Sequence, residues 1–223
     1  MGRRALILGA TGLIGGHLLN HLLHSNAYDY VAIITRRDFP FEHPKLQKFT
    51  FELSELEKFK EVFKVHDVFC CLGTTIKKAG SESAFKQVDF EYPLAAGKIA
   101  IEAGAEQFLT VSAMGASSDS RIFYNRVKGE MEEGIKKLPF TGVHIFRPSL
   151  LLGKREEFRL GERAAEWFAK PFSGFLKGSL KKYAPIPAET VACSMVVSAL
   201  KRESGIHIYE SDKIKEQTEL KQP

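Results

Sequence analysis

The feature that most restricts the fold is a set of three glycines, Gly9, Gly12 and Gly15. They separate a short apolar run from a helical pattern. Residues 4–8 (RALIL) are mostly apolar and lead directly into the first glycine, which is typical of a strand buried on both faces. Leucines at helical spacing follow over residues 13–24. A strand, a tight turn and a helix in this order are typical of the start of a dinucleotide-binding α/β fold.

Each glycine of this turn has a physical reason. We expect Gly9 to permit the tight turn, Gly12 to let the backbone approach a pyrophosphate, and Gly15 to let the helix pack closely on the strand. The start of the helix offers unpaired N–H groups and the positive end of its dipole to the phosphates. The spacing is GxxGxxG rather than the commoner GxGxxG, so the prediction depends on the flanking strand and helix. The alternative is a strand–helix turn without a ligand.

Buried strands and helical patterns alternate along the chain. Further strands are predicted over residues 31–35, 48–53, 67–72, 107–112, 142–151 and 206–209. Helices are predicted over residues 83–104, 124–137, 161–170 and 188–202. This alternation predicts an α/β fold with a doubly wound, Rossmann-type parallel sheet, in a single domain that spans residues 1–223.

Composition and charge exclude several classes of protein. The chain is 44% hydrophobic and 26% charged, which excludes disordered and fibrous proteins. A net charge of +5 favours anionic ligands in general, but without a nucleic-acid module we expect no nucleic-acid partner. No apolar run reaches the ~20 residues that a membrane span needs, so we expect no span.

The cysteines and histidines indicate neither a disulfide framework nor a metal site. The chain has three cysteines, Cys70, Cys71 and Cys193. Because their number is odd and two of them are adjacent, we predict reduced thiols in a cytoplasmic protein. His17, His21 and His24 have the spacing of metal ligands on one helical face. They also form the polar side of the first helix and no carboxylate or cysteine joins them in sequence, so we expect no metal.

Two arginines follow the second predicted strand, about twenty residues after the turn, where an NAD enzyme usually carries an acidic residue. Guanidinium groups can bind a 2′-phosphate bidentately and stack on adenine. Arg36 and Arg37 therefore predict NADP as the cofactor. Asp38, one position later, keeps NAD open as the second choice, and an ordinary solvated pair is the alternative.

A serine, a tyrosine and a lysine form the candidate catalytic set. Tyr124 and Lys128 are four residues apart and share one helical face, while Ser112 closes the fifth strand at the edge where ligands of such folds bind. A tyrosine hydroxyl is a poor base near neutral pH, but an adjacent ammonium favours its phenolate. We predict that Ser112 bonds the reacting oxygen, Tyr124 exchanges its proton and Lys128 holds the cofactor ribose. A chance YxxxK is the alternative.

With these motifs the chain resembles an atypical short-chain dehydrogenase/reductase. Within that family it resembles the subgroup of Tat-interacting, tumour-suppressor-type oxidoreductases and their bacterial relatives. The resemblance runs nearly end to end, over the motifs GATGLIGG, TRRD, CLGTT, KKAGSESAFKQVDFEYP, YNRVKGE, FRPSLLLG and REEFRLGE. It implies a cofactor site made of Gly9, Thr11, Gly12, Leu13, Ile14, Gly15, Arg36, Arg37, Leu72, Gly73, Tyr124, Lys128, Pro148, Leu151 and Arg159. Within this set, Leu72 and Gly73 would flank the adenine and ribose, and Leu151 and Arg159 would close over the nicotinamide.

Two departures from the family pattern bear on the prediction. Asp89 stands where longer relatives have asparagine, which argues against a water relay through that position. Extended members also carry a C-terminal substrate domain that we do not expect here, so residues 154–186 are predicted as a small substrate-side or lid segment.

Residues 167–176 are rich in large apolar groups but are broken by proline and glycine. A lid, a dimer contact, a membrane-surface patch and plain core all stay open for this stretch.

The sequence thus predicts an NADP-dependent oxidoreductase that acts on a small carbonyl or alcohol. Hydride would pass between the nicotinamide and a carbon while Tyr124 exchanges the proton at oxygen. The alternative is a regulatory or interaction protein that uses bound NADP(H) as a structural or redox signal, since the resembling proteins are associated with protein partners. The intact catalytic set favours the enzyme. A protein partner or a homodimer stays open beside the small-molecule substrate.

Overall fold

The computed structural model describes residues 2–153 and 183–219. Within them, seven strands form one parallel sheet in the order β3-β2-β1-β4-β5-β6-β9. The strands are β1 Arg3–Leu8, β2 Tyr28–Thr35, β3 Leu46–Thr50, β4 Asp67–Cys70, β5 Gln107–Val111, β6 Gly142–Arg147 and β9 Gly205–Glu210. The order is that of a dinucleotide-binding fold with one further strand. The prediction of a doubly wound, single-domain α/β fold is confirmed.

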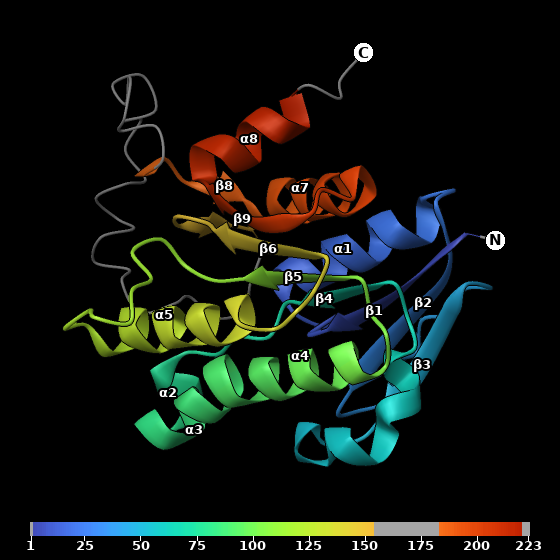
Figure 1. The fold of residues 1–223 in the computed structure, drawn as a ribbon, viewed down its shortest axis with the longest axis horizontal. Helices are drawn as coiled ribbons and strands as arrows, with labels where there is room; N and C mark the ends of the chain where they lie inside the picture. Colours follow the sequence, from blue (N-terminus) through green and yellow to red (C-terminus); the bar gives the residue numbers. More distant parts are fainter. Residues whose placement is uncertain (1, 154–182, 220–223) are drawn as a thin grey trace.

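Helices cover both faces of this sheet (Figure 1). They are α1 Leu13–His24, η1 Leu53–Phe63, α2 Ile76–Ala79, α3 Glu82–Lys86, η2 Gln87–Glu91, α4 Tyr92–Glu102, α5 Phe123–Lys136, α7 Ala188–Lys201 and α8 Ser211–Glu219. Helices α1, α7 and α8 lie on one face, and η1, α4 and α5 lie on the other (Figure 1). Successive side chains of a strand point to opposite faces, so Ile7 joins the core under α1 and α7 while Leu6 and Leu8 join the other core.

Several elements differ from the prediction. The helix predicted over residues 83–104 is divided into α3, the π-helical turn η2 and α4, with Pro93 in the first turn of α4. Proline has no N–H to bond the preceding turn, which explains an irregular turn at this point. The strand predicted over 142–151 ends at Arg147, just before Pro148, and Leu151–Leu152 forms a separate short strand, β7, paired with β8 (Ile186–Pro187). The predicted helix 161–170 and the stretch 167–176 lie outside the described residues.

A buried carboxylate joins the amino ends of four strands, at the edge opposite to the glycine turn. Asp67 accepts hydrogen bonds from Arg3 at 2.7 and 2.6 Å, from the Tyr28 hydroxyl at 2.8 Å and from the Gln107 amide at 2.6 Å. The side chain of Asp67 is fully buried. Because all four acceptor positions of Asp67 have a donor, this network stabilises the sheet edge and leaves the carboxylate of Asp67 no capacity for a ligand.

His144 extends the same network and gives the fold an expected sensitivity to acid. Its ring is buried between Gln107 and Tyr209, and burial lowers the pKa of His144 to about 4, with His207 and Lys201 adding to the effect. The unfolded chain binds this proton near pH ~6.5, so stability is lost as the pH falls from there through the folded value. We expect a loss of up to about 3 kcal/mol over that range.

Urea unfolding at several pH values measures this loss. His144→Gln should flatten the dependence of the unfolding free energy on pH between about 6.5 and 4. The exposed His24, which bonds only the Asn20 carbonyl of its own helix, offers a matched control, and His24→Gln should leave the slope unchanged. An unaltered slope in His144→Gln would contradict the assignment.

The remaining cysteines and histidines show no sign of chemistry. Burial raises the pKa of the Cys70 thiol to about 11 and raises that of Cys71 as well, which makes both poor nucleophiles.

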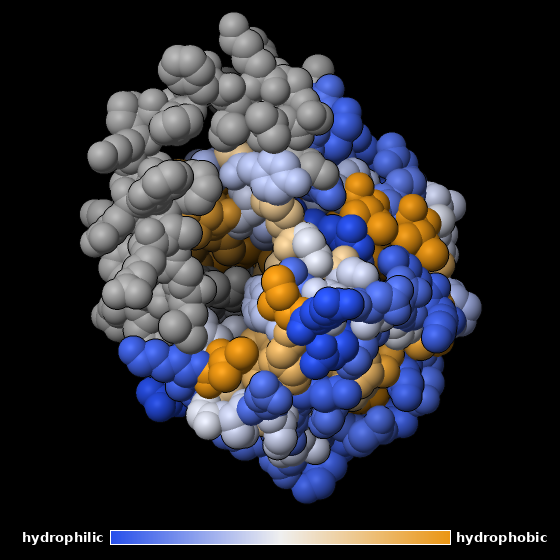
Figure 2. All heavy atoms as spheres, turned by 90° about the vertical axis from the view of Figure 1, so that its left-hand side faces the viewer, coloured by the Kyte–Doolittle hydropathy of each residue, from blue (hydrophilic) through white to orange (hydrophobic). Residues whose placement is uncertain are grey.

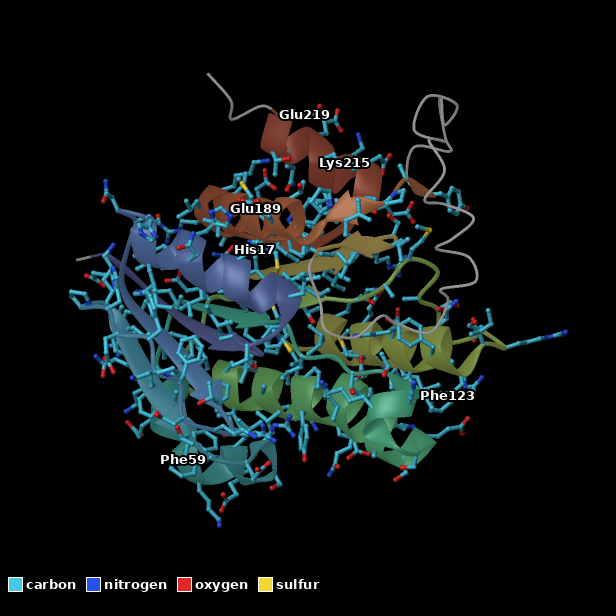
Figure 3. All side chains as sticks on the ribbon, turned by 180° about the vertical axis from the view of Figure 1, so that it is seen from behind. His17, Phe59, Phe123, Glu189, Lys215 and Glu219 are labelled. Atoms are coloured by element: carbon cyan, nitrogen blue, oxygen red, sulfur yellow. The ribbon has the colours of Figure 1, made fainter. Side chains whose placement is uncertain are left out.

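The described residues contain no group of three or more side chains placed to hold a metal ion. His17 lies on α1 and Glu189 on the facing helix α7, far from Phe123 at the start of α5 (Figure 3). No helix in the described ranges is long and apolar enough to cross a membrane.

Candidate functional site

The glycine turn connects β1 to α1 at the carboxyl edge of the sheet. Gly9 has a φ of +83°, and a Cβ there would lie 2.7 Å from the carbonyl oxygen of Cys71. A Cβ at Gly15 would lie 2.1 Å from the carbonyl oxygen of Gly9. Neither position can hold a side chain without movement of the backbone. Gly9 is needed for the positive φ and for the approach of the segment after β4, and Gly15 is needed for the close approach of helix and strand.

The start of α1 fits a phosphate group. Gly12 is the N-cap residue, is exposed, and provides no side chain to cap the helix. Its N–H donates to the Gly9 carbonyl at 3.0 Å, which fixes the turn. Thr11 is also exposed, and Leu13, Ile14 and Gly15 form the first helical turn behind it. An uncapped N-terminus with exposed backbone is a suitable site for a pyrophosphate.

Arg36 and Arg37 follow β2 at the same edge, and both are exposed with Asp38 next to them. Arg36 lies near enough to Tyr92, at the start of α4, to act on it electrostatically. Burial, Glu52 and Glu91 raise the pKa of Tyr92, and the positive charge of Arg36 opposes that rise. That Arg36 and Arg37 contact the ribose phosphate of a dinucleotide stays a prediction.

The loop after β4 passes directly beside the glycine turn. The N–H of Cys71 donates to the Leu8 carbonyl at 2.8 Å. Leu72 is partly buried and Gly73 is exposed. The backbone N–H of Thr74 then donates to the carboxylate of Asp89 at 2.8 Å. The loop is thus held at both ends, next to the place predicted for adenine and ribose.

Tyr124 and Lys128 share one face of α5. Tyr124 is partly exposed, and its ring lies 5.6 Å from that of Phe85, centre to centre. Lys128 is buried, with its Nζ 2.8 Å from Asp89 Oδ1 and 3.3 Å from the Val111 carbonyl oxygen. The pair therefore combines a partly exposed tyrosine with a buried ammonium that is held by Asp89 and the Val111 carbonyl.

Ser112 follows β5, but the structure gives its hydroxyl a different partner from the one predicted. The hydroxyl is buried and donates to Glu132 Oε1 at 2.5 Å. Arg147 binds the same carboxylate through two hydrogen bonds of 2.9 and 2.5 Å. Sequence reasoning missed Glu132 and Arg147. The signal for Glu132 was present, because it lies four residues after Lys128 on the same helical face.

The segment after β6 reaches back to the glycine turn. The carbonyl of Pro148, which is buried, accepts from the N–H of Met114 at 3.1 Å. Leu151 packs against the core cluster that lies under α1. Gly153 lies so close to the turn that a Cβ there would be 2.7 Å from Leu13 Cδ1. Arg159, predicted to close over the nicotinamide, lies outside the described residues.

The molecule is hollowed at this edge. Figure 2 looks onto the carboxyl ends of the strands and shows hydrophobic atoms inside a hollow at this edge. The sheet order, the uncapped glycine turn and the residues around this edge define a Rossmann-type, dinucleotide-binding protein.

Comparisons with known proteins agree with this class. The NAD(P)H-binding family matches residues 9–138. The chain is 37% identical to the protein HTATIP2 of Rattus norvegicus over 207 residues, which are 91% of this chain and 84% of that protein. It is 36% identical to the mitochondrial protein FMP52 of Candida albicans over 206 residues, 89% of each chain. The chain belongs to the NAD(P)H-binding family and is an atypical short-chain dehydrogenase/reductase that resembles HTATIP2.

Solved structures show the same fold at low sequence identity. MoeE5 in complex with UDP-glucose and NAD has a TM-score of 0.69 at 15% identity, and the match covers 98% of this chain and 82% of MoeE5. A UDP-glucose 4-epimerase from Thermotoga maritima, with UDP-glucose, has a TM-score of 0.68 at 13% identity, covering 97% and 82%. At such identities the likeness shows the fold alone.

The prediction of a cytoplasmic location is wrong. The fungal relatives from Candida albicans and Emericella nidulans, at 36% and 32% identity, are both named mitochondrial proteins. The prediction depended on unpaired cysteines and on the lack of a long apolar run. Those features argue against a disulfide framework and a membrane span, but they do not distinguish one reducing compartment from another.

Proposed function

We propose that this protein is an NADP-dependent oxidoreductase that acts on a small carbonyl or alcohol. One observation carries the proposal: Tyr124 and Lys128 share a face of α5 at the same sheet edge as the uncapped glycine turn. A dinucleotide whose pyrophosphate lies on the start of α1 would extend along this edge, with its adenosine toward Arg36 and its nicotinamide toward α5.

The residues of the site divide the work as follows. When bound, the cofactor supplies or accepts a hydride. Tyr124 exchanges a proton with the substrate oxygen, because it is partly exposed and shares a face of α5 with Lys128. Lys128 is held by Asp89 and Val111, which fixes its ammonium for the ribose beside the nicotinamide. That Ser112 also bonds the reacting oxygen stays a prediction, since its hydroxyl donates to Glu132 here.

A second candidate, a regulatory protein that binds the cofactor without turnover, is favoured by that same serine. The Ser112 hydroxyl is buried and directed at Glu132, so the third member of the predicted catalytic set is already occupied. Turnover that is lost in a Tyr124→Phe variant would distinguish the enzyme from the regulatory candidate.

The choice of NADP over NAD is open to direct test. A charge-assisted contact to a phosphate contributes ~1.5–3 kcal/mol, or roughly ten- to a hundredfold in affinity. NADPH should therefore bind at least about tenfold tighter than NADH, and the difference should shrink as salt rises. Replacing Arg36 and Arg37 together with alanine should weaken NADPH much more than NADH. Calorimetric titration of both cofactors measures this difference.

A matched control removes two exposed lysines elsewhere. Lys58 lies on η1 and Lys64 directly follows it, and they pair with Glu55 and Glu61 on the surface. Their double alanine variant has the same net charge as the double arginine variant and should keep the wild-type preference. Equal affinities for NADPH and NADH in the wild type would refute the NADP assignment and leave Asp38 as the ribose ligand.

A further inference from the structure

Asp89 is a fully buried carboxylate with two separate contacts. Its Oδ1 lies 2.8 Å from the ammonium nitrogen of Lys128, and its Oδ2 accepts the N–H of Thr74 at 2.8 Å. Asp89 lies in the π-helical turn η2, Lys128 on α5 and Thr74 in the loop after β4. A single side chain therefore connects the lysine of the candidate site to the loop beside the glycine turn.

The buried pair changes the charge that the site presents to a ligand. The side chains of Lys128 and Asp89 are 3% and 0% exposed, so water screens them little. A charge in such a place acts strongly on a second charge a few ångströms away. Because Asp89 is in direct contact with the ammonium, the two opposite charges largely cancel for any group that approaches from the hollow.

The other ionisable groups around the pair leave this balance unchanged. Burial raises the pKa of the nearby Cys70 to about 11, so its thiol is neutral at physiological pH. Lys86 on α3 and Glu130 on α5 pair at 3.2 Å, but their side chains are 43% and 33% exposed, so water screens both charges. The charge facing the cofactor is therefore controlled by whether Lys128 has its carboxylate partner.

The two redox states of a nicotinamide differ in charge. The oxidised ring carries a positive charge and the reduced ring is neutral. An unbalanced ammonium beside the ribose would repel the oxidised ring and leave the reduced ring unaffected. At the distances of a cofactor site this repulsion corresponds to about tenfold in affinity.

We propose that Asp89 is a positioning residue that balances the charge of Lys128, so that the site holds the oxidised and the reduced cofactor with similar affinity. This inference rests on the proposed function, in which Lys128 contacts the ribose beside the nicotinamide. It also deepens that function. Turnover requires binding of one redox state and release of the other, whereas a redox sensor requires a site that discriminates between them.

The test is a titration of the full chain with NADP⁺ and with NADPH. Asp89→Asn retains an oxygen that can accept the Thr74 N–H but removes the negative charge. We expect NADP⁺ to weaken about tenfold more than NADPH in this variant. A merely structural role would weaken both cofactors equally. Glu130→Gln, which removes a carboxylate of α5 that pairs with Lys86 instead, should leave the ratio of the two affinities unchanged.

A double variant keeps the test valid even if Asp89→Asn folds poorly, since removing one charge of a buried ion pair is destabilising. The double variant, Asp89→Asn with Lys128→Met, has no charge at either position. Its net charge at the pair is therefore zero, the same as in the wild type. Its ratio of NADP⁺ to NADPH affinity should return to within about threefold of the wild type, although both affinities fall with the loss of the ribose contact. Lys128→Met alone should shift the ratio toward NADP⁺.

The outcomes separate this inference from the proposed function. Equal weakening of both cofactors in Asp89→Asn, or an unchanged ratio in both single variants, would overturn the charge-balancing role while leaving the oxidoreductase intact. A wild-type chain that binds neither dinucleotide would overturn the proposed function, and this inference with it.

Discussion

Gly15→Ala should destabilise the fold by at least about 3 kcal/mol and abolish dinucleotide binding. The added Cβ would lie 2.1 Å from the Gly9 carbonyl oxygen, 2.8 Å from its carbon and 2.9 Å from the Ala10 Cα. All three are backbone atoms, so no side chain can rotate away to make room. Helix α1 would have to move off the end of β1, which removes the phosphate site and opens the core between α1 and the sheet.

The next residue provides the control. A Cβ at Gly16 would lie 3.7 Å from the Ala10 carbonyl oxygen, which is an ordinary contact, and the position is exposed. Gly16→Ala should therefore fold and should gain about 0.5–1 kcal/mol, because alanine is the better helix former. Urea unfolding and NADPH titration of the two variants measure the contrast. A Gly15→Ala protein with wild-type stability would show that the close approach of helix and strand is not needed.

The parts of the fold that could be predicted from the sequence are those that depend on neighbours along the chain. The glycine turn between β1 and α1 is one such part, because the positive φ of Gly9 and the contact of Gly15 with the Gly9 carbonyl both arise within a few residues. The buried strands are another, since a continuous apolar run with no polar side has to be covered on both faces. Helix α1 agrees with its predicted bounds, residues 13–24, because its apolar stripe is uninterrupted.

The parts that could not be predicted depend on contacts between distant segments. Helix α8 is strongly polar. Its first residue, Ser211, connects it to the rest of the fold, because the Ser211 hydroxyl accepts a hydrogen bond of 2.7 Å from the N–H of Ser149, 62 residues away in sequence. The partner of Ser112 is a second example. A serine at a strand end suggested catalysis, but its hydroxyl donates to Glu132, which Arg147 also binds, only after α5 has packed against the sheet. The spacing from Lys128 places Glu132 on the right face of α5, but it does not show that Ser112 or Arg147 is the partner.

Tyr124→Phe should lower kcat by about 10²–10⁴-fold while leaving NADPH affinity and stability nearly unchanged. The variant removes one partly exposed hydroxyl and keeps the ring that packs against Phe85 at 5.6 Å. A proton donor or acceptor at the substrate oxygen acts mainly in the transition state, so its loss appears in kcat rather than in cofactor binding. Turnover is followed by NADPH oxidation with a panel of small aldehydes and ketones.

The control for this experiment is a tyrosine outside the site. Tyr30 lies on β2, where the Arg4 guanidinium stacks on its ring at 4.2 Å, so Tyr30→Phe should keep wild-type turnover and stability. If Tyr124→Phe retained more than about a tenth of the wild-type kcat, general acid–base catalysis by this residue would be excluded. NADPH binding that survives in a wild-type chain with no turnover on any carbonyl would instead favour the regulatory candidate, in which Tyr124 and Lys128 serve only to hold the cofactor.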